Sequence, residues 1–68
     1  MTTYAKVKQT IASLEGVKAT LQLYGETAQE ESARKTFQRN AEKLDDLIRQ
    51  LKKRQQKMEF EEPQYKGF

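Results

Sequence analysis

The side chains that could do chemistry in this 68-residue chain are carboxylates, amines and hydroxyls, because it contains no Cys and no His. Thiol nucleophiles, Ser-His-Asp triads and Cys/His zinc sites are therefore excluded. Neighbouring residues of a helix point about 100° apart, so paired carboxylates on a helix do not converge on one metal ion. The pairs concerned are Glu30 with Glu31, Asp45 with Asp46, and Glu61 with Glu62. We expect no enzyme, no cofactor and no metal site.

A block of basic residues in the second half of the chain could contact phosphates. It consists of Arg49, Lys52, Lys53, Arg54 and Lys57. Each phosphate that such residues neutralise releases counterions and adds affinity for nucleic acid. The alternative, which we favour, is that these cations stabilise the negative C-terminal end of a helix dipole. No aromatic residue interrupts the block to stack on bases, and the net charge is only +3. A small basic nucleic-acid-binding protein is therefore the second function that we consider.

Two helices must position these groups, because apolar residues recur at helical spacing along most of the chain. The first helix is predicted over residues 3–24, with Thr2 or Thr3 as its N-cap and Gly25 as its stop. One face of this helix is expected to be buried. Its apolar residues are Val7, Ile11, Leu14, Val17, Leu21 and Tyr24.

The second helix is predicted over residues 28–58. Thr27 and Glu30 match the capping box that starts a helix, and Pro63 must lie beyond the end. The back of this helix is charged and is expected to be solvated, with ion pairs such as that between Asp45 and Arg49. Its apolar positions are Ala33, Phe37, Ala41, Leu44, Ile48, Leu51 and Met58, with Leu47 beside them.

A connection of about three residues makes the two helices an antiparallel hairpin. Counting outward from the turn pairs Ile11 with Ala41 and Tyr4 with Ile48. In this register, the last turns of the second helix extend past the first helix and carry most of the basic block. The predicted core consists of Val7, Ile11, Leu14, Leu21, Phe37, Leu44, Ile48 and Leu51.

Self-association is expected, because a chain this short has little core. Two helices also leave one edge of each apolar stripe exposed to solvent. The predicted fold class is all-α: an antiparallel hairpin that pairs into a homodimeric four-helix bundle. A second face of the first helix is either solvated, since alanine favours helix formation, or a close helix-to-helix contact. We predict contact. This face consists of Ala12, Gly16, Ala19 and Leu23.

The hairpin is expected to occupy residues 1–60 and to be followed by an extended strap over residues 61–68. Aromatic residues cluster near the strap, whereas disordered ends are usually poor in them. The tail is either a passive end with incidental rings, or it docks on the bundle or on a partner; we predict docking. The residues concerned are Phe60, Pro63, Tyr65 and Phe68.

The sequence gives no sign of a membrane span or of a secretory signal. No apolar run approaches the roughly 18 residues of a span, and the first ten residues lack the hydrophobic segment of a signal peptide. We expect an intracellular protein with no transmembrane segment of its own.

Three segments resemble a family of small proteins, the domain of unknown function 1657. They are residues 7–17 (VKQTIASLEGV), the acidic Glu30 and Glu31 ahead of Ala33 and Phe37, and residues 61–67 (EEPQYKG). That family belongs to endospore-forming Firmicutes, and its genes tend to lie beside those of spore inner-membrane proteins. The resemblance implies a non-enzymatic interaction or structural protein of the forespore or spore, with a spore inner-membrane protein as partner and no catalytic residues.

Overall fold

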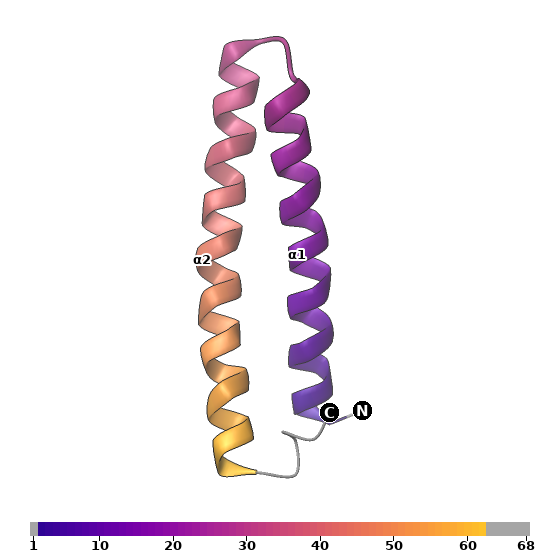
Figure 1. The fold of residues 1–68 in the computed structure, drawn as a ribbon, viewed down its shortest axis with the longest axis vertical. Coiled ribbons are helices and arrows are strands. Elements are labelled where there is room, and N and C mark those ends of the chain that lie inside the picture. Colours follow the sequence, from indigo (N-terminus) through magenta and orange to yellow (C-terminus); the bar gives the residue numbers. More distant parts are fainter. Residues whose placement is uncertain (1, 63–68) are drawn as a thin grey trace.

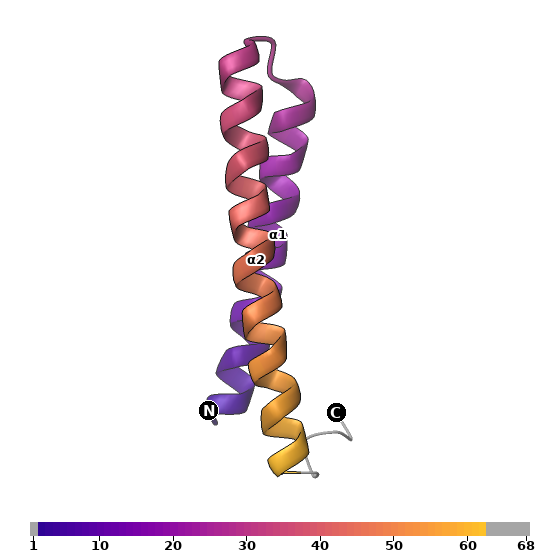
Figure 2. The same cartoon turned by 90° about the vertical axis from the view of Figure 1, so that its left-hand side faces the viewer.

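The fold is an antiparallel hairpin of two long helices, as the sequence predicts. The structure is a computed structural model that describes residues 2–62. Helix α1 spans Thr3–Thr27 and helix α2 spans Glu31–Glu61, with no strand between residues 2 and 62. The helices run side by side along their lengths (Figure 1) and cross at a shallow angle (Figure 2). The molecule measures 48 × 17 × 16 Å.

Helix α1 begins at one of the two predicted caps but does not end at Gly25. The Thr2 side chain accepts a hydrogen bond from the Ala5 backbone N–H at 3.1 Å, which satisfies one free donor of the first turn. Gly25 is helical, buried and without a positive φ. A Cβ at this glycine would lie 3.2 Å from Gln38 Cγ of α2. Gly25 therefore allows α2 to approach closely and does not reverse the chain, and α1 continues to Thr27.

The predicted capping box is wrong. Thr27 is the last residue of α1, and its hydroxyl donates to the Leu23 carbonyl at 3.0 Å. Glu30 is the N-cap of α2 and makes no side-chain capping bond; its carboxylate accepts instead from Ser32 Oγ at 2.6 Å. The helix then begins at Glu31, three residues later than predicted.

Helix α2 also ends three residues later than predicted, at Glu61. The backbone N–H of Glu62 still donates to the Met58 carbonyl at 2.9 Å, and the chain leaves helical geometry there. This end agrees with the bias that Pro63 imposes on the residue before it. Glu61, which the sequence places in the strap, belongs to the hairpin.

The predicted register is wrong by about three turns of helix. The sequence pairs Tyr4 with Ile48, whereas the Tyr4 hydroxyl donates to Glu59 at 2.7 Å, eleven residues further along α2. Lys18 contacts Asp45 in the same alignment. The cause lies at the turn, where α1 runs on through Gly25 and the start of α2 projects past the end of α1 (Figure 1). Because Tyr4 lies beside Glu59, α2 does not extend past α1 by several turns.

The buried core lies between the helices and reaches towards the open end of the hairpin. Ile48 is its most buried side chain, with 3% of its surface exposed, and it packs with Val7 and Ile11. The half-buried side chains Leu14, Leu51 and Met58 pack against this cluster. A shift of three turns leaves the same face of each helix towards its partner, so apolar positions predicted for the core still meet. Tyr4 and Ala41 are buried as well, and Leu21, Phe37 and Leu44 are half-buried.

Candidate interaction surface

The two long sides of the hairpin, where the seam between the helices meets solvent, differ in chemistry. We call one the polar side; its residues are Glu15, Lys18 and Gln22 of α1 and Gln38, Asp45 and Lys52 of α2. We call the other the open apolar side; its residues are Leu14, Val17, Leu21 and Tyr24 of α1 and Phe37, Leu44, Leu47 and Leu51 of α2. Each set follows helical spacing along both helices, so each forms a continuous strip.

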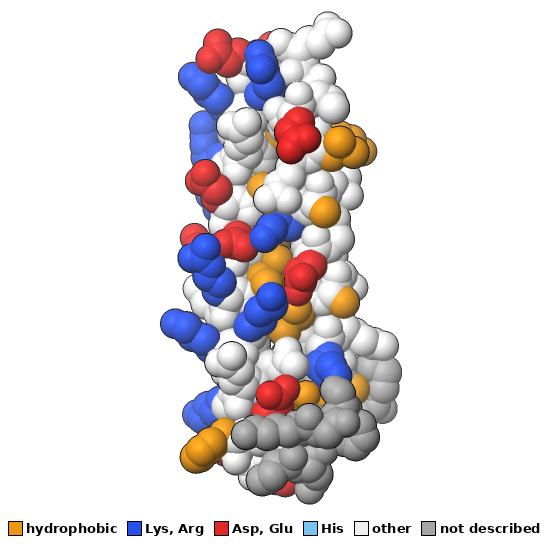
Figure 3. All heavy atoms as spheres, in the orientation of Figure 1, with side chains coloured by type: hydrophobic (Ala, Val, Ile, Leu, Met, Phe, Trp, Pro, Cys, Tyr) orange, Lys and Arg blue, Asp and Glu red, His pale blue; other side chains and the backbone are white. Residues whose placement is uncertain are grey.

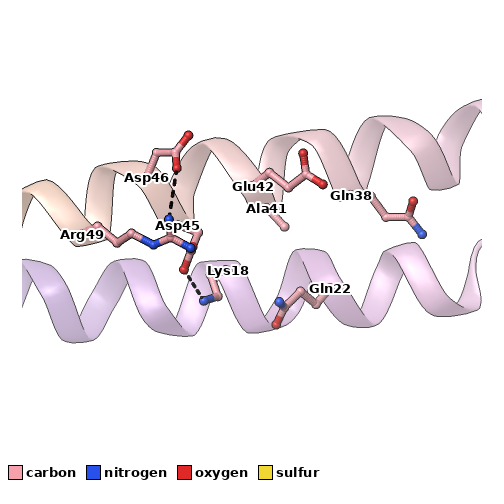
Figure 4. A pocket seen from close by; sticks show the side chains of 8 residues that line it. All are labelled: Lys18, Gln22, Gln38, Ala41, Glu42, Asp45, Asp46 and Arg49. Atoms are coloured by element: carbon pink, nitrogen blue, oxygen red, sulfur yellow. Dashed lines mark hydrogen bonds and ion pairs between the residues drawn. The ribbon is translucent and has the colours of Figure 1, made fainter.

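The polar side carries a network of ion pairs, two of which cross between the helices. Lys18 Nζ lies 2.7 Å from Asp45 Oδ1, and Arg49 Nη2 lies 2.7 Å from Asp45 Oδ2 (Figure 4). Lys52 Nζ lies 3.5 Å from Glu15 Oε1. The predicted pair of Asp45 with Arg49 is therefore confirmed, and it is joined by a cation from the other helix. These contacts fix the register of the hairpin on this side.

Asp45 is the best-defined electrostatic group of the polar side. The hydrogen bond that Lys18 donates lowers the pKa of the Asp45 carboxyl below its ordinary value of 3.8, and the charge of Arg49 acts in the same direction. Partial desolvation opposes this shift but does not cancel it. A carboxylate that is held ionised between two cations is a poor proton acceptor at neutral pH. Asp45 therefore suits a structural role.

The polar side contains a groove, but its lining is not suited to metal binding. Gln22, Gln38 and Glu42 line the groove beside the ion pairs (Figure 4). Between residues 2 and 62, no group of three acidic side chains is placed to hold an ion. The groove is thus a solvated channel along paired charges.

The open apolar side keeps large apolar side chains partly in contact with solvent. The rings of Tyr24 and Phe37 lie 5.4 Å apart and join the two helices near the turn. Further along, Val17 is 49% exposed and Leu47 is 43% exposed. At the register set by the ion pairs, these two residues lie at nearly the same level. Large apolar side chains in a continuous strip are typical of a surface that another molecule covers.

The outer surface of α1 is almost free of charge. Most charged residues of this helix follow the rows of the polar side: Lys8, Glu15, Lys18 and Glu26. The fifth, Lys6, lies eleven residues before Val17 and therefore in its row, beside the open apolar side. Blue and red side chains cover α2 and the seam, whereas the outer edge of α1 shows white and orange ones (Figure 3). The back of α1 is therefore uncharged, and one cation, Lys6, lies beside its open apolar side.

The small-residue face of α1 lies on this uncharged outer surface. Ala12, Gly16, Ala19 and Leu23 are all exposed. A Cβ at Gly16 would meet no atom within 4 Å, apart from its own helix backbone. No contact within the hairpin uses this face, so its role in self-association stays a prediction.

The basic block does not form one patch, because its members point to different sides of α2. Arg49 and Lys52 lie on the polar side and are paired with carboxylates. Lys53 and Lys57, one turn apart, lie on the back of the helix, and Arg54 lies beside the open apolar side. All five are exposed. Two of the five charges are therefore already engaged, and the other three line one groove along α2 together with Glu61.

The open end of the hairpin is joined by a hydrogen-bond network that the sequence does not indicate. Glu59 accepts from the hydroxyl of the buried Tyr4 and, at 3.0 Å, from Gln55 Nε2. Lys8 Nζ lies 5.6 Å from the centre of the Tyr4 ring. Phe60 is part of α2 and is 81% exposed. The other predicted strap residues lie outside the described residues: Pro63, Tyr65 and Phe68.

Sequence reasoning missed the pair of Lys18 and Asp45, although a signal for it exists. Lys18 falls between Leu14 and Leu21 in the row that faces α2, and Asp45 borders the corresponding row of α2. Opposite charges at inward positions of two paired helices indicate a cross-helix ion pair. Recognising this pair would have set the register correctly.

A family model described as a protein of unknown function, DUF1657, matches residues 7–54. No curated protein and no solved structure gives a significant match. Neither α1 nor α2 is long and apolar enough to cross a membrane.

Proposed function

The chain belongs to the DUF1657 family, and we propose that it is a non-enzymatic helical interaction protein whose open apolar side binds an apolar helical surface. The setting that we propose is the forespore or spore of an endospore-forming bacterium. A spore inner-membrane protein is the partner that fits this setting. The observation that supports the proposal is the exposure of Val17 and Leu47 in a strip that carries no charge.

The energetic argument is that solvent contact of this strip is unfavourable. Burying a large aliphatic side chain contributes about 1.5–3 kcal/mol when it passes from full exposure to full burial. In the isolated hairpin, nearly half of the surface of Val17, Leu47 and Tyr24 is still exposed, so nearly half of this stabilisation is not gained. A partner that covers the strip would gain this free energy without unpairing any buried charge.

The polar side restricts binding to the opposite long side of the hairpin. Its ion pairs are satisfied within the hairpin, and covering them would require their desolvation. Binding is thus favoured on one long side and disfavoured on the other. This asymmetry suits an adaptor that presents one surface to a partner and keeps the other in water.

Site-specific photocrosslinking in sporulating cells tests the proposal. A photoreactive residue replaces Val17 or Leu47 on the open apolar side, and in matched controls it replaces the exposed Gln9 or Gln50. We expect adducts with one defined membrane protein from the first two positions and few from the controls. Equal adducts from all four positions would show that the open apolar side is not the binding surface. Recovery of nucleic acid, with affinity that falls steeply as salt rises, would favour the second function.

A further inference from the structure

The open apolar side has a shape and a charge pattern that fit a second copy of this chain. We propose that two hairpins pair through this side into a four-helix bundle, in which α1 of each copy packs on α2 of the other and both turns lie at the same end. This inference rests on the proposed function, because it names an occupant of the same surface. The membrane-protein partner would then compete with, or replace, the second copy.

One long side of the hairpin is large enough for a stable interface. The whole side measures 48 by 17 Å, a projected area of about 800 Å², which is close to what each partner buries in an interface of standard size. The apolar strip occupies about 15–21 Å of this length. The two helices are nearly level at the open end, since Tyr4 contacts Glu59, so a second hairpin can cover the strip along most of its length. A two-fold axis makes the same surface serve both copies.

The charges beside the strip select the arrangement. On α2, Lys43 and Arg54 lie four residues before and seven residues after Leu47, so they border the strip in its row. On α1, the corresponding border has Thr10, Ser13 and Thr20 beside Val17, and one cation, Lys6, eleven residues before Val17 in the same row. Packing α2 on α2 would place cations opposite cations, which is unfavourable. Packing α1 on α2 faces the two cations of each α2 with the hydroxyl groups and the single cation of the other copy's α1, so it brings fewer like charges together.

The register of the hairpin also agrees with this arrangement. A two-fold axis along the length of the bundle keeps every residue at its own level and exchanges α1 with α2. Val17 and Leu47 are nearly level within one hairpin, because Lys18 contacts Asp45 next to them. The rotation therefore brings Val17 of one copy opposite Leu47 of the other. The two most exposed aliphatic side chains of the strip would therefore contact each other at two symmetry-related places in the dimer.

Sedimentation of the purified full chain is the first test. We expect a dimer at micromolar concentration that dissociates on dilution. The substitution Val17→Lys should raise the dissociation constant of this dimer at least tenfold. The matched control Gln9→Lys adds the same charge on the back of α1 and should leave the dimer intact. A folded monomer of the unaltered chain at 100 µM would overturn the inference. The oligomeric state of the unaltered chain does not depend on the variant, so the inference remains testable even if Val17→Lys misfolds.

Disulfide trapping tests the arrangement, and the absence of natural cysteines makes it specific. Chains with Val17→Cys and with Leu47→Cys are oxidised separately and as a mixture. We expect the mixture to form disulfide-linked pairs of the two different chains, and each chain alone to form few. Efficient linkage of Val17→Cys with itself would show α1 packed on α1 and would overturn the arrangement. A monomer that still gives the photocrosslinks at Val17 would refute the second copy and keep the proposed function.

Discussion

Substituting the two glycines within α1 should have different effects, although both are helical and neither has a positive φ. Glycine in a helix interior costs about 0.5–1 kcal/mol relative to alanine. At Gly16 nothing lies within 4 Å of an added Cβ. We expect Gly16→Ala to gain this amount in full, which raises the melting temperature by about 4–8 °C per kcal/mol for a domain of this size.

At Gly25 the same gain in helix stability is opposed by steric contact with α2. An added Cβ lies 3.2 Å from Gln38 Cγ, 3.7 Å from Phe37 Cβ and 3.8 Å from the Arg34 carbonyl oxygen. Gln38 is exposed and can rotate away, so Gly25→Ala should be nearly neutral, within about 0.5 kcal/mol of the unaltered chain. A larger side chain would press on the backbone of α2. We expect Gly25→Leu to destabilise the hairpin by about 1–3 kcal/mol, while the side chain of Gly16→Leu meets no contact within the hairpin.

The assay is thermal and urea unfolding followed by circular dichroism, at one fixed protein concentration because association shifts the midpoint. The leucine variants decide the question, since they differ only in what surrounds each glycine. If Gly25→Leu is as stable as Gly16→Leu, α2 does not pack closely on Gly25 and the reasoning is wrong. If Gly16→Leu dissociates the dimer, the small-residue face is a contact between copies, as the sequence predicts.

Three further predictions concern the core, the open end and the polar side. Ile48→Ala removes the most buried side chain and should cost about 2–5 kcal/mol, enough to abolish the helical signal at low concentration; retention of full helicity there would contradict the observed core. Tyr4→Phe removes the hydrogen bond to Glu59 and should lower the free energy of unfolding by about 1.5–3 kcal/mol, measured by urea unfolding, whereas the exposed Thr3→Ala should change little. Asp45→Asn should destabilise at pH 7, because the lowered pKa of Asp45 means that its ionised form stabilises the fold. The difference from the unaltered chain should shrink as pH falls below 3.8, and a gap that is constant down to pH 2 would refute this role.

Local features of the fold followed from the sequence because they depend on nearby residues. Helical spacing predicted two helices, and the Thr2 cap was one of the two options for the start of α1. The short connection then required an antiparallel hairpin. The faces turned towards the partner helix were also predictable, since Val7, Ile11 and Ile48 recur with the period of the helix. The family could be recognised in the same way, from three short segments, of which residues 7–17 and 30–37 lie within the matched residues 7–54.

The turn was harder to predict, because its residues each fit two structures. Gly25 suits a helix stop by its conformational freedom, and equally a close packing position by its missing side chain. Only the approach of Gln38 from α2 shows which property is used. Thr27 and Glu30 likewise match a capping box in sequence, yet Thr27 ends α1 and Glu30 starts α2 without a side-chain cap.

The level at which the helices meet, and therefore the surface left open, was decided by tertiary structure alone. The period of the apolar residues determines which face of a helix is buried, and that much the sequence established. Sliding one helix by about three turns restores the same face, so the period cannot distinguish one level from another. Contacts between residues far apart in sequence make that distinction: Lys18 with Asp45, Glu15 with Lys52, and Tyr4 with Glu59. Those contacts close the polar side and leave Val17 and Leu47 level and exposed on the other.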